Sequence, residues 1–225
     1  MTAAPLSIVV LISGSGSNLQ ALIDRSLQQQ HYAVTAVISN QPDAYGLERA
    51  RNAGIDPICI NHTDYPDRES FEDALCKQID QYKPDLLALA GFMRILTPSF
   101  VQHYQGRALN IHPSLLPAYR GLHTHRRVLE AGDAVHGCSV HFVTDELDGG
   151  PLIIQSRVPV LDGDTEEVLA ARVLKDEHII YPLVVNWYAQ GRLRLQGHTV
   201  CFDGRSLLQP FVLQELDNAQ NPLPS

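Results

Sequence analysis

Asn110 and His112 are the residues whose types and spacing most directly indicate chemistry. They stand two positions apart in a short apolar stretch, and alternate side chains of a β-strand point to the same face. An amide donor beside an imidazole can stabilise a negatively charged oxygen, and histidine readily exchanges a proton near neutral pH. A lone histidine can also be held structurally at a sheet edge, so this pair by itself leaves catalysis and structure both open.

A carboxylate that would complete this group lies in the segment Thr144–Gly150 (TDELDGG). Asp148 precedes two glycines and could be only a turn residue, because Asp-Gly pairs are common in turns. Close to His112, its carboxylate would favour the charged imidazole and orient the ring. Asp145 and Glu146 are interpreted as surface or loop-capping groups. The sequence therefore makes Asp148 the candidate third member of the group.

A glycine-containing loop, Gly14–Gln20, follows the first expected strand and precedes the first expected helix. Its glycines allow close backbone approach, and a helix N-terminus offers free N–H groups and partial positive charge to an anion. Ser17 and Gln20 match a capping box that would set the start of the helix. A dinucleotide site would have glycine in place of Leu19 and an acidic residue in place of Ser39-Asn40. One terminal phosphate is therefore the expected ligand, and a merely tight connection is the alternative.

The segment Gly91–Leu96 (GFMRIL) is an apolar loop with one cation. It precedes Thr97 and Pro98, which predict the start of a helix, and it could simply pack around that start. It could also form a slot for a flat ring whose edge is hydrogen-bonded by backbone groups. Both interpretations remain open from the residues alone.

Four histidines lie close together in the sequence, which raises the question of a metal site. They are His123, His125, His136 and His141. The His-x-His pair is compatible with two metal ligands, but no carboxylate or cysteine accompanies it at metal-site spacing. We therefore expect that no metal takes part.

Short apolar segments alternate with helical ones through the first half of the chain. The expected strands are Ser7–Ser13, Ala33–Ser39, Pro57–Ile60, Leu86–Ala90 and Ala108–Ile111. The expected helices are Asn18 to about Gln29, Leu47–Ala53, Arg68–Tyr82 and one beginning at Thr97-Pro98. Strands without polar alternation, separated by helices, indicate a parallel sheet covered on both faces. Ligands bind at the carboxyl ends of such strands, so the three candidate loops are expected at one edge.

The second half of the chain has a different pattern. Cys138–Val143 (CSVHFV) alternates, and a turn at Asp148-Gly149-Gly150 leads into an apolar run over Leu152–Val160, which indicates antiparallel or mixed strands. Asp164 is expected to cap a helix that runs to about Tyr188. The predicted fold class is α/β and Rossmann-like. Its largely parallel sheet is flanked by helices and has a mixed or antiparallel extension in the C-terminal half.

Charge and composition exclude several functional classes. The chain has 225 residues and a formal net charge of −8, so it lacks the broad basic face that nucleic acid requires. Four cysteines without short repeated spacing fit a reducing compartment. The N-terminal sequence has no basic region, and its apolar run ends at Ser13. We therefore expect neither a signal peptide nor a membrane span, and a cytoplasmic location.

Several segments together resemble the phosphoribosylglycinamide formyltransferases, a folate-dependent family of purine synthesis. They are Ile12–Gln20, Leu89–Leu96 (LAGFMRIL), Asn110–Pro117, Gly121–His125 (GLHTH) and Ser139–Pro151 (SVHFVTDELDGGP), and the similarity extends to about Arg194. The catalytic residues that the resemblance implies are Asn110, His112 and Asp148. The implied ribonucleotide-binding residues are Gly16, Ser17, Asn18 and Glu177. The implied folate-binding residues are Arg68, Met93, Arg94, Ile95, Leu96, Asn110, Thr144, Asp145, Glu146, Leu147 and Asp148.

The resemblance also implies a reaction, the direct transfer of the formyl group of 10-formyltetrahydrofolate to the amine of 5′-phosphoribosylglycinamide. In that reaction the amine attacks the formyl carbon. Asn110 and protonated His112 hold the oxyanion of the tetrahedral intermediate, and Asp148 assists proton removal. The formyl folate is a co-substrate and no metal is implied. The expected partners are these small molecules, without nucleic acid or membrane, and the expected state is a monomer or a homodimer.

Three other functions are weighed against this one. Methionyl-tRNA formyltransferase has a loop similar to Pro117–Gly121, but it continues with Ala-Ala-Pro-Ile where this chain has Leu122–His125, and it carries a basic C-terminal domain. 10-Formyltetrahydrofolate hydrolase shares the catalytic trio and has an N-terminal regulatory domain, for which a first strand at Ser7 leaves no expected place. The complete trio argues against a catalytically silent nucleotide-binding protein.

The expected organisation is one domain over residues 1–215, because no linker, repeat or low-complexity tract divides the chain. Residues 1–105 would form the half that binds nucleotide or phosphate. Residues 106–215 would form the catalytic and folate-binding half, and residues 216–225 a loose C-terminal tail.

Overall fold

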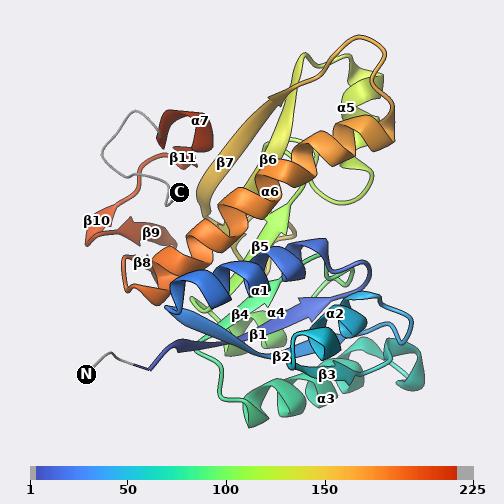
Figure 1. Ribbon diagram of the computed structural model, residues 1–225, viewed down its shortest axis with the longest axis vertical. Coiled ribbons are helices and arrows are strands. Elements are labelled where there is room, and N and C mark those ends of the chain that lie inside the picture. The colour runs from blue at the N-terminus through green and yellow to red at the C-terminus, as the bar shows by residue number, and fades with distance from the viewer. Residues whose placement is uncertain (1–3, 217–225) are drawn as a thin grey trace.

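An eight-stranded sheet forms the centre of the computed structural model, which describes residues 4–216 (Figure 1). The strands lie in the order β11-β7-β6-β5-β4-β1-β2-β3. The parallel part consists of β1 (Leu6–Ile12), β2 (Tyr32–Ser39), β3 (Asp56–Cys59), β4 (Leu86–Leu89) and β5 (Ala108–His112). Every strand predicted in the first half of the chain is present.

The second half of the chain continues the same sheet. β6 (Val135–Phe142) pairs antiparallel with β5 and with β7 (Leu152–Pro159), and β11 (Phe211–Val212) adds a parallel edge to β7. The predicted α/β fold class with a mixed extension is therefore confirmed. A separate three-stranded sheet lies outside the sequence prediction, and it contains β8 (Leu193–Gln196), β9 (Thr199–Phe202) and β10 (Arg205–Ser206).

Helices cover both faces of the sheet, and alternate residues of β1 show why. Ile8, Val10 and Ile12 are buried in one apolar cluster with residues of α1, α2 and α6. Val9 and Leu11 are buried in a second cluster with residues of α3 and α4. A strand buried on both faces needs an unbroken apolar sequence. The helices are α1 (Ser17–Gln29), α2 (Gly46–Asn52), α3 (Arg68–Gln81), α4 (Pro98–His103), α5 (Thr124–Ala131), α6 (Glu166–Ala189) and α7 (Leu213–Leu216), with a short 3-10 turn, η1 (His62–Asp64).

Helix α6 crosses the sheet and is hydrogen-bonded to two of its central strands (Figure 1). The fully buried Tyr181 hydroxyl lies 2.9 Å from the Leu89 carbonyl oxygen and 3.1 Å from the Leu109 carbonyl oxygen. These carbonyls belong to β4 and β5, next to each other in the sheet. The bonds therefore hold α6 against the carboxyl end of β4 and the first half of β5.

The predicted start of α4 is confirmed, and the predicted start of α6 needs a correction. Thr97 caps α4 as predicted, with Pro98 at the first helical position. The predicted cap of α6 at Asp164 is wrong by one residue, because Thr165 Oγ1 accepts the Val168 N–H at 3.3 Å. Asp164 is instead engaged by the guanidinium group of Arg172, so its carboxylate does not serve the helix end.

No helix among residues 4–216 is both long and apolar enough to cross a membrane. Of the tail predicted over residues 216–225, only Leu216 lies within the described residues, where it ends α7. The division of residues 1–215 into two functional halves stays a prediction.

Candidate active site

Asn110 and His112 lie on β5, at the carboxyl edge of the sheet. Both side chains contribute to one pocket of about 550 Å³, as the two-residue spacing predicts. His112 Nε2 lies 3.1 Å from the Tyr119 carbonyl oxygen, and His112 Nδ1 lies 3.5 Å from Asp148 Oδ2. The buried ring therefore has oxygen acceptors beside both of its nitrogens, to which ring N–H groups would donate.

Asp148 reaches His112 from the loop between β6 and β7. Its φ of 48° is left-handed, a conformation that aspartate adopts more readily than most residues. Gly150 lies so close to β6 that an added Cβ would be 1.8 Å from the Phe142 carbonyl oxygen. The Gly121 N–H donates to Asp148 Oδ2 at 2.9 Å. The two interpretations of Asp148, as a turn residue and as a site residue, therefore agree, because the turn delivers the carboxylate to the site.

His141 belongs to this group, although the sequence suggested it only as one of four histidines to consider for a metal. It stands opposite Asn110 in the antiparallel pairing of β5 and β6. His141 Nε2 lies 3.2 Å from Asn110 Nδ2 and 4.0 Å from Asp148 Oδ1. Burial lowers the pKa of His141, which favours the neutral ring. Its Nδ1–H then donates to the Phe142 carbonyl at 2.8 Å, and its Nε2 accepts from the Asn110 amide and orients it.

The loop Gly14–Asn18 leads from β1 into α1. Gly16 is the N-cap of α1, with φ 70° and ψ 29° and without a side-chain cap. The predicted capping box is therefore wrong, because Ser17 is already the first helical residue and the Gln20 side chain donates to Asp24 on the same helix. The first turn of α1 keeps its N–H groups for an anion, as the predicted phosphate site requires.

Asn18 and Glu177 lie far apart in the sequence and in contact in the structure. Asn18 Nδ2 donates to Glu177 Oε2 at 2.7 Å, and both side chains are buried. Burial raises the pKa of Glu177, and the bond from Asn18 partly offsets this rise. Asn18 Oδ1 is also buried and has no hydrogen-bond partner among the described residues. Such an atom is rare in a folded protein, and it indicates a place for a ligand or a water molecule.

The predicted folate-binding residues line two adjoining pockets. The larger one, of about 550 Å³, includes Arg68 and Met93. The smaller one, of about 100 Å³, includes Arg94, Ile95, Leu96 and the run 144–148. Asn110 and Asp148 line both pockets, which therefore adjoin at the candidate catalytic group. Met93 and Ile95 are 64% and 55% exposed, and apolar surface beside convergent polar groups is typical of a small-molecule site.

The larger pocket is also lined by residues that were not predicted as site residues, among them Leu122, His123, His125 and Glu166. Leu122 and His123 precede α5, His125 is the second residue of that helix, and Glu166 starts α6. The sequence motif GLHTH marks the first three, but nothing in its spacing indicates which pocket they would line.

Comparison with known proteins decides the family. Residues 6–185 match the family described as formyl transferase. The chain belongs to this family. It is 57% identical over 203 residues to the phosphoribosylglycinamide formyltransferase of Escherichia coli (strain K12), covering 90% of this chain and 96% of that protein. The phosphoribosylglycinamide formyltransferase of Haemophilus influenzae is 45% identical over 201 residues, covering 89% and 95%.

A solved structure supports the same assignment. The phosphoribosylglycinamide formyltransferase of Coxiella burnetii matches this formyl transferase with a TM-score of 0.89 and 52% identity, over 92% of this chain and 99% of that one. The family and the class of enzyme predicted from the sequence are therefore confirmed.

Three of the four histidines considered for a metal site in this formyl transferase have hydrogen-bond partners within the protein. His125 Nδ1 lies 3.0 Å from His136 Nε2. Burial lowers the pKa of both rings, that of His136 to about 4, so two neutral rings can share one N–H here. Across residues 4–216, no three His, Cys, Asp or Glu side chains come together as a set that could hold a metal ion.

Formyl transfer is expected to survive exhaustive chelation, because His125 and His136 bind each other and His141 binds Asn110. The test compares the transfer rate before and after dialysis against a strong chelator, with the metal content measured in both samples. A rate lost on chelation and restored by zinc would contradict this prediction.

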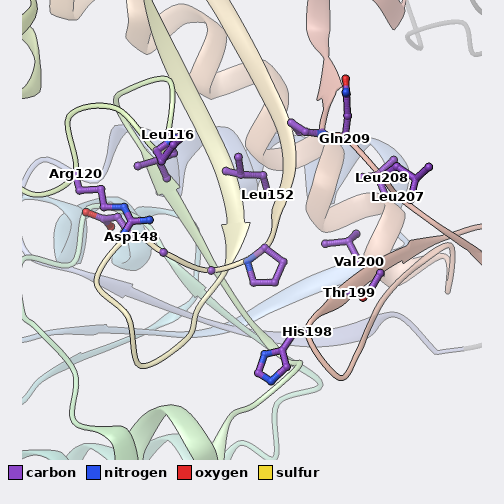
Figure 2. A pocket seen from close by; sticks show the side chains of 15 residues that line it. Leu116, Arg120, Asp148, Leu152, His198, Thr199, Val200, Leu207, Leu208 and Gln209 are labelled. Atoms are coloured by element: carbon purple, nitrogen blue, oxygen red, sulfur yellow. The ribbon is translucent and has the colours of Figure 1, made fainter.

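A third cavity, of about 540 Å³, also borders the Asp148 loop and is called the rear cavity (Figure 2). Arg120 and Asp148 line one end of this rear cavity. The other end is lined by His198–Val200 and Leu207–Pro210, from the C-terminal segment that the sequence prediction left without strands. Asp148 therefore lines this cavity as well as the pocket at the end of β5.

Proposed function

We propose that this protein transfers the formyl group of 10-formyltetrahydrofolate to the amine of 5′-phosphoribosylglycinamide in purine biosynthesis. The observation that carries the proposal is the meeting of Asn110, His112 and Asp148 where two pockets join. Formyl transfer needs donors for an oxyanion and a group that takes a proton, and these three side chains supply both. The names of the relatives from Escherichia coli and Coxiella burnetii support this choice of acceptor.

The ribonucleotide is proposed to bind with its phosphate at the loop Gly14–Asn18. Backbone N–H groups and the positive end of α1 can hold a phosphate without a lysine, even in a chain of net charge −8. Glu177 lies beside the loop, where its carboxylate would accept hydrogen bonds from ribose hydroxyl groups. A hydroxyl group would also give Asn18 Oδ1 the partner that the described residues do not provide.

The folate is proposed to bind between the loop after β4 and the loop after β6. Met93–Leu96 and Thr144–Asp148 line the two pockets there, and their exposed apolar side chains suit a flat ring. Arg68 lines the larger pocket, where its positive charge suits the acidic tail of a folate.

The chemistry follows from the three side chains at the junction. As the amine attacks the formyl carbon, a C–N bond forms and the carbonyl electrons move to the oxygen. Asn110, oriented by His141, donates a hydrogen bond to that oxygen, and His112 donates a second one by exchanging its bond to the Tyr119 carbonyl for one to the oxyanion. Asp148 takes the proton that the attacking nitrogen loses, and Asp148 also lines the rear cavity. When the intermediate collapses, the bond to the folate nitrogen breaks and that nitrogen takes up a proton, so protons balance.

An acceptor assay tests this function. We expect tetrahydrofolate to be released from 10-formyltetrahydrofolate roughly a hundredfold faster with 5′-phosphoribosylglycinamide than with water alone, because a bound amine reacts within the site. Methionyl-tRNA should give no acceleration. Equal rates with and without the ribonucleotide would indicate a hydrolase, and acceleration by methionyl-tRNA would indicate a tRNA formyltransferase. Either result would contradict the proposal.

A further inference from the structure

Helix α2 supports the loop Gly14–Asn18 through direct backbone contact. The Gly46 N–H, at the start of α2, donates to the Gly14 carbonyl at 3.0 Å. A Cβ added to Gly16 would lie 2.6 Å from Gly46 Cα, and a Cβ added to Gly46 would lie 2.4 Å from the Ile12 side chain. Two glycines therefore allow loop and helix to pack against each other without intervening side chains.

Arg49, one turn further along α2, holds the next carbonyl of the loop. Its Nε–H donates to the Ser15 carbonyl at 2.8 Å, and its Nη1 donates to Gln20 Oε1 on α1 at 3.3 Å. The guanidinium group also lies over the Tyr45 ring, 5.0 Å from the ring centre, which adds a cation–π contact. Three neighbours therefore fix the position of this half-buried side chain.

These contacts determine where the amides of the loop point. In a trans peptide, the C=O and the N–H that follows it point in opposite directions. Because α2 holds the carbonyl oxygens of Gly14 and Ser15, the N–H groups of Ser15 and Gly16 point away from α2. The left-handed Gly16 then leads into the first turn of α1, whose N–H groups extend the row. Successive N–H groups of this kind form an anion-binding surface.

We propose that Arg49 is a positioning residue that sets the affinity of the protein for the phosphate of the ribonucleotide. This inference rests on the proposed function, since it requires the loop Gly14–Asn18 to bind that phosphate. Arg49 acts through Ser15 by orienting the backbone donors, and its charge makes the loop more positive. It therefore confers a preference for the phosphorylated acceptor over the same glycinamide riboside without phosphate.

Arg49→Met tests the proposal, because methionine is a good helix former that removes the donors and the charge. We expect its Kd for ribose 5-phosphate and its KM for 5′-phosphoribosylglycinamide to rise roughly tenfold to a hundredfold. The kcat and the KM for the folate should stay near the wild-type values. Arg51→Met is the matched control, since Arg51 lies exposed on the same helix and pairs with Glu48. It should behave like the wild type.

The preference of the enzyme for the phosphorylated acceptor shows whether Arg49 positions the phosphate loop or only stabilises the fold. We expect the ratio of kcat/KM for the phosphorylated acceptor to that for the unphosphorylated riboside to fall in Arg49→Met, whereas general loosening would lower both values equally. Arg49→Gln, which is also uncharged, replaces the methionine variant if thermal unfolding shows that variant to be unfolded. Arg49→Lys keeps the charge without the Nε–H, and it should recover only part of the affinity.

The outcomes also separate this inference from the proposed function. A wild-type protein that neither binds ribose 5-phosphate nor formylates the ribonucleotide would refute the proposed function. A wild-type protein that does both, together with an Arg49→Met variant of unchanged ribonucleotide KM, would refute only the role of Arg49. An equal rise in KM for the folate, or an equal loss in Arg51→Met, would also refute that role.

Discussion

His112→Ala is expected to lower the kcat of formyl transfer roughly a hundredfold to a thousandfold, because the loss of one oxyanion donor typically has an effect of this size. Asp148→Asn should have a comparable effect, since the amide keeps the shape of the carboxylate but cannot take the proton of the amine. Both variants should lower kcat far more than they weaken the binding of either substrate, because the loop Gly14–Asn18 and the segment Met93–Leu96 remain intact. Steady-state kinetics gives kcat and both KM values for each variant.

The double variant shows whether His112 and Asp148 act together. Their side chains lie 3.5 Å apart in a buried site, and residues that act as a unit show strongly non-additive losses. The double variant should therefore be little worse than the worse single variant. Fully multiplicative losses would mean that the residues act independently, and a near-normal kcat in Asp148→Asn would remove that residue from the mechanism.

A surface histidine–carboxylate pair provides a matched control for these variants. His103 Nε2 lies 2.9 Å from Asp80 Oδ2, and both side chains are close to half exposed. His103→Ala and Asp80→Asn make the same chemical changes outside the two active-site pockets. Both should retain a kcat near that of the wild type, which would assign the losses at His112 and Asp148 to the site.

The placement of Asn110 and His112 could be predicted from the local sequence. The spacing of Asn110 and His112 is enough to place both on one side of a strand, because the side-chain period of a strand is two residues. Their position at the carboxyl edge follows from the parallel order of the strands, which the alternation of apolar and helical segments indicates. The structure brings both residues to one pocket at that edge.

The contacts between distant segments could not be predicted in this way. His141 meets Asn110 only because β5 and β6 pair antiparallel in one particular register, which a strand pattern alone does not determine. Asn18 and Glu177 meet because α1 and α6 pack side by side, although 159 positions separate them. Such contacts depend on packing in three dimensions, so periodicity along the chain carries little information about them.

Two errors at helix starts have local physical causes. Ser17 and Gln20 have the spacing of a capping box, but the left-handed Gly16 takes the cap position and leaves Ser17 inside the helix. Asp164 has a competing partner in Arg172, so Thr165 caps α6 instead. In both cases several residues satisfy the same sequence rule, and a tertiary contact or a backbone conformation selects among them.

Gly16→Val is expected to weaken ribonucleotide binding strongly, by roughly tenfold to a hundredfold, because strain of one to a few kcal/mol must be relieved by moving the loop. A β-branched residue is disfavoured at a φ of 70°, and any Cβ at this position would lie 2.6 Å from Gly46 Cα. The loop would have to leave α2, and its N–H groups would then lose their common direction. Calorimetry with the ribonucleotide and with the folate measures the effect.

Folate binding should be preserved in Gly16→Val, because the residues that line the proposed folate pockets belong to other loops. Gly54→Val is the matched control, since Gly54 has a similar φ of 69° outside this loop and an added Cβ there meets nothing within 4 Å. Gly16→Ala, which adds a single methyl group, should give an intermediate loss and shows whether the valine variant is merely unfolded. If folate affinity fell while ribonucleotide affinity held, the loop would belong to the folate site, and its assignment to the phosphate would be wrong.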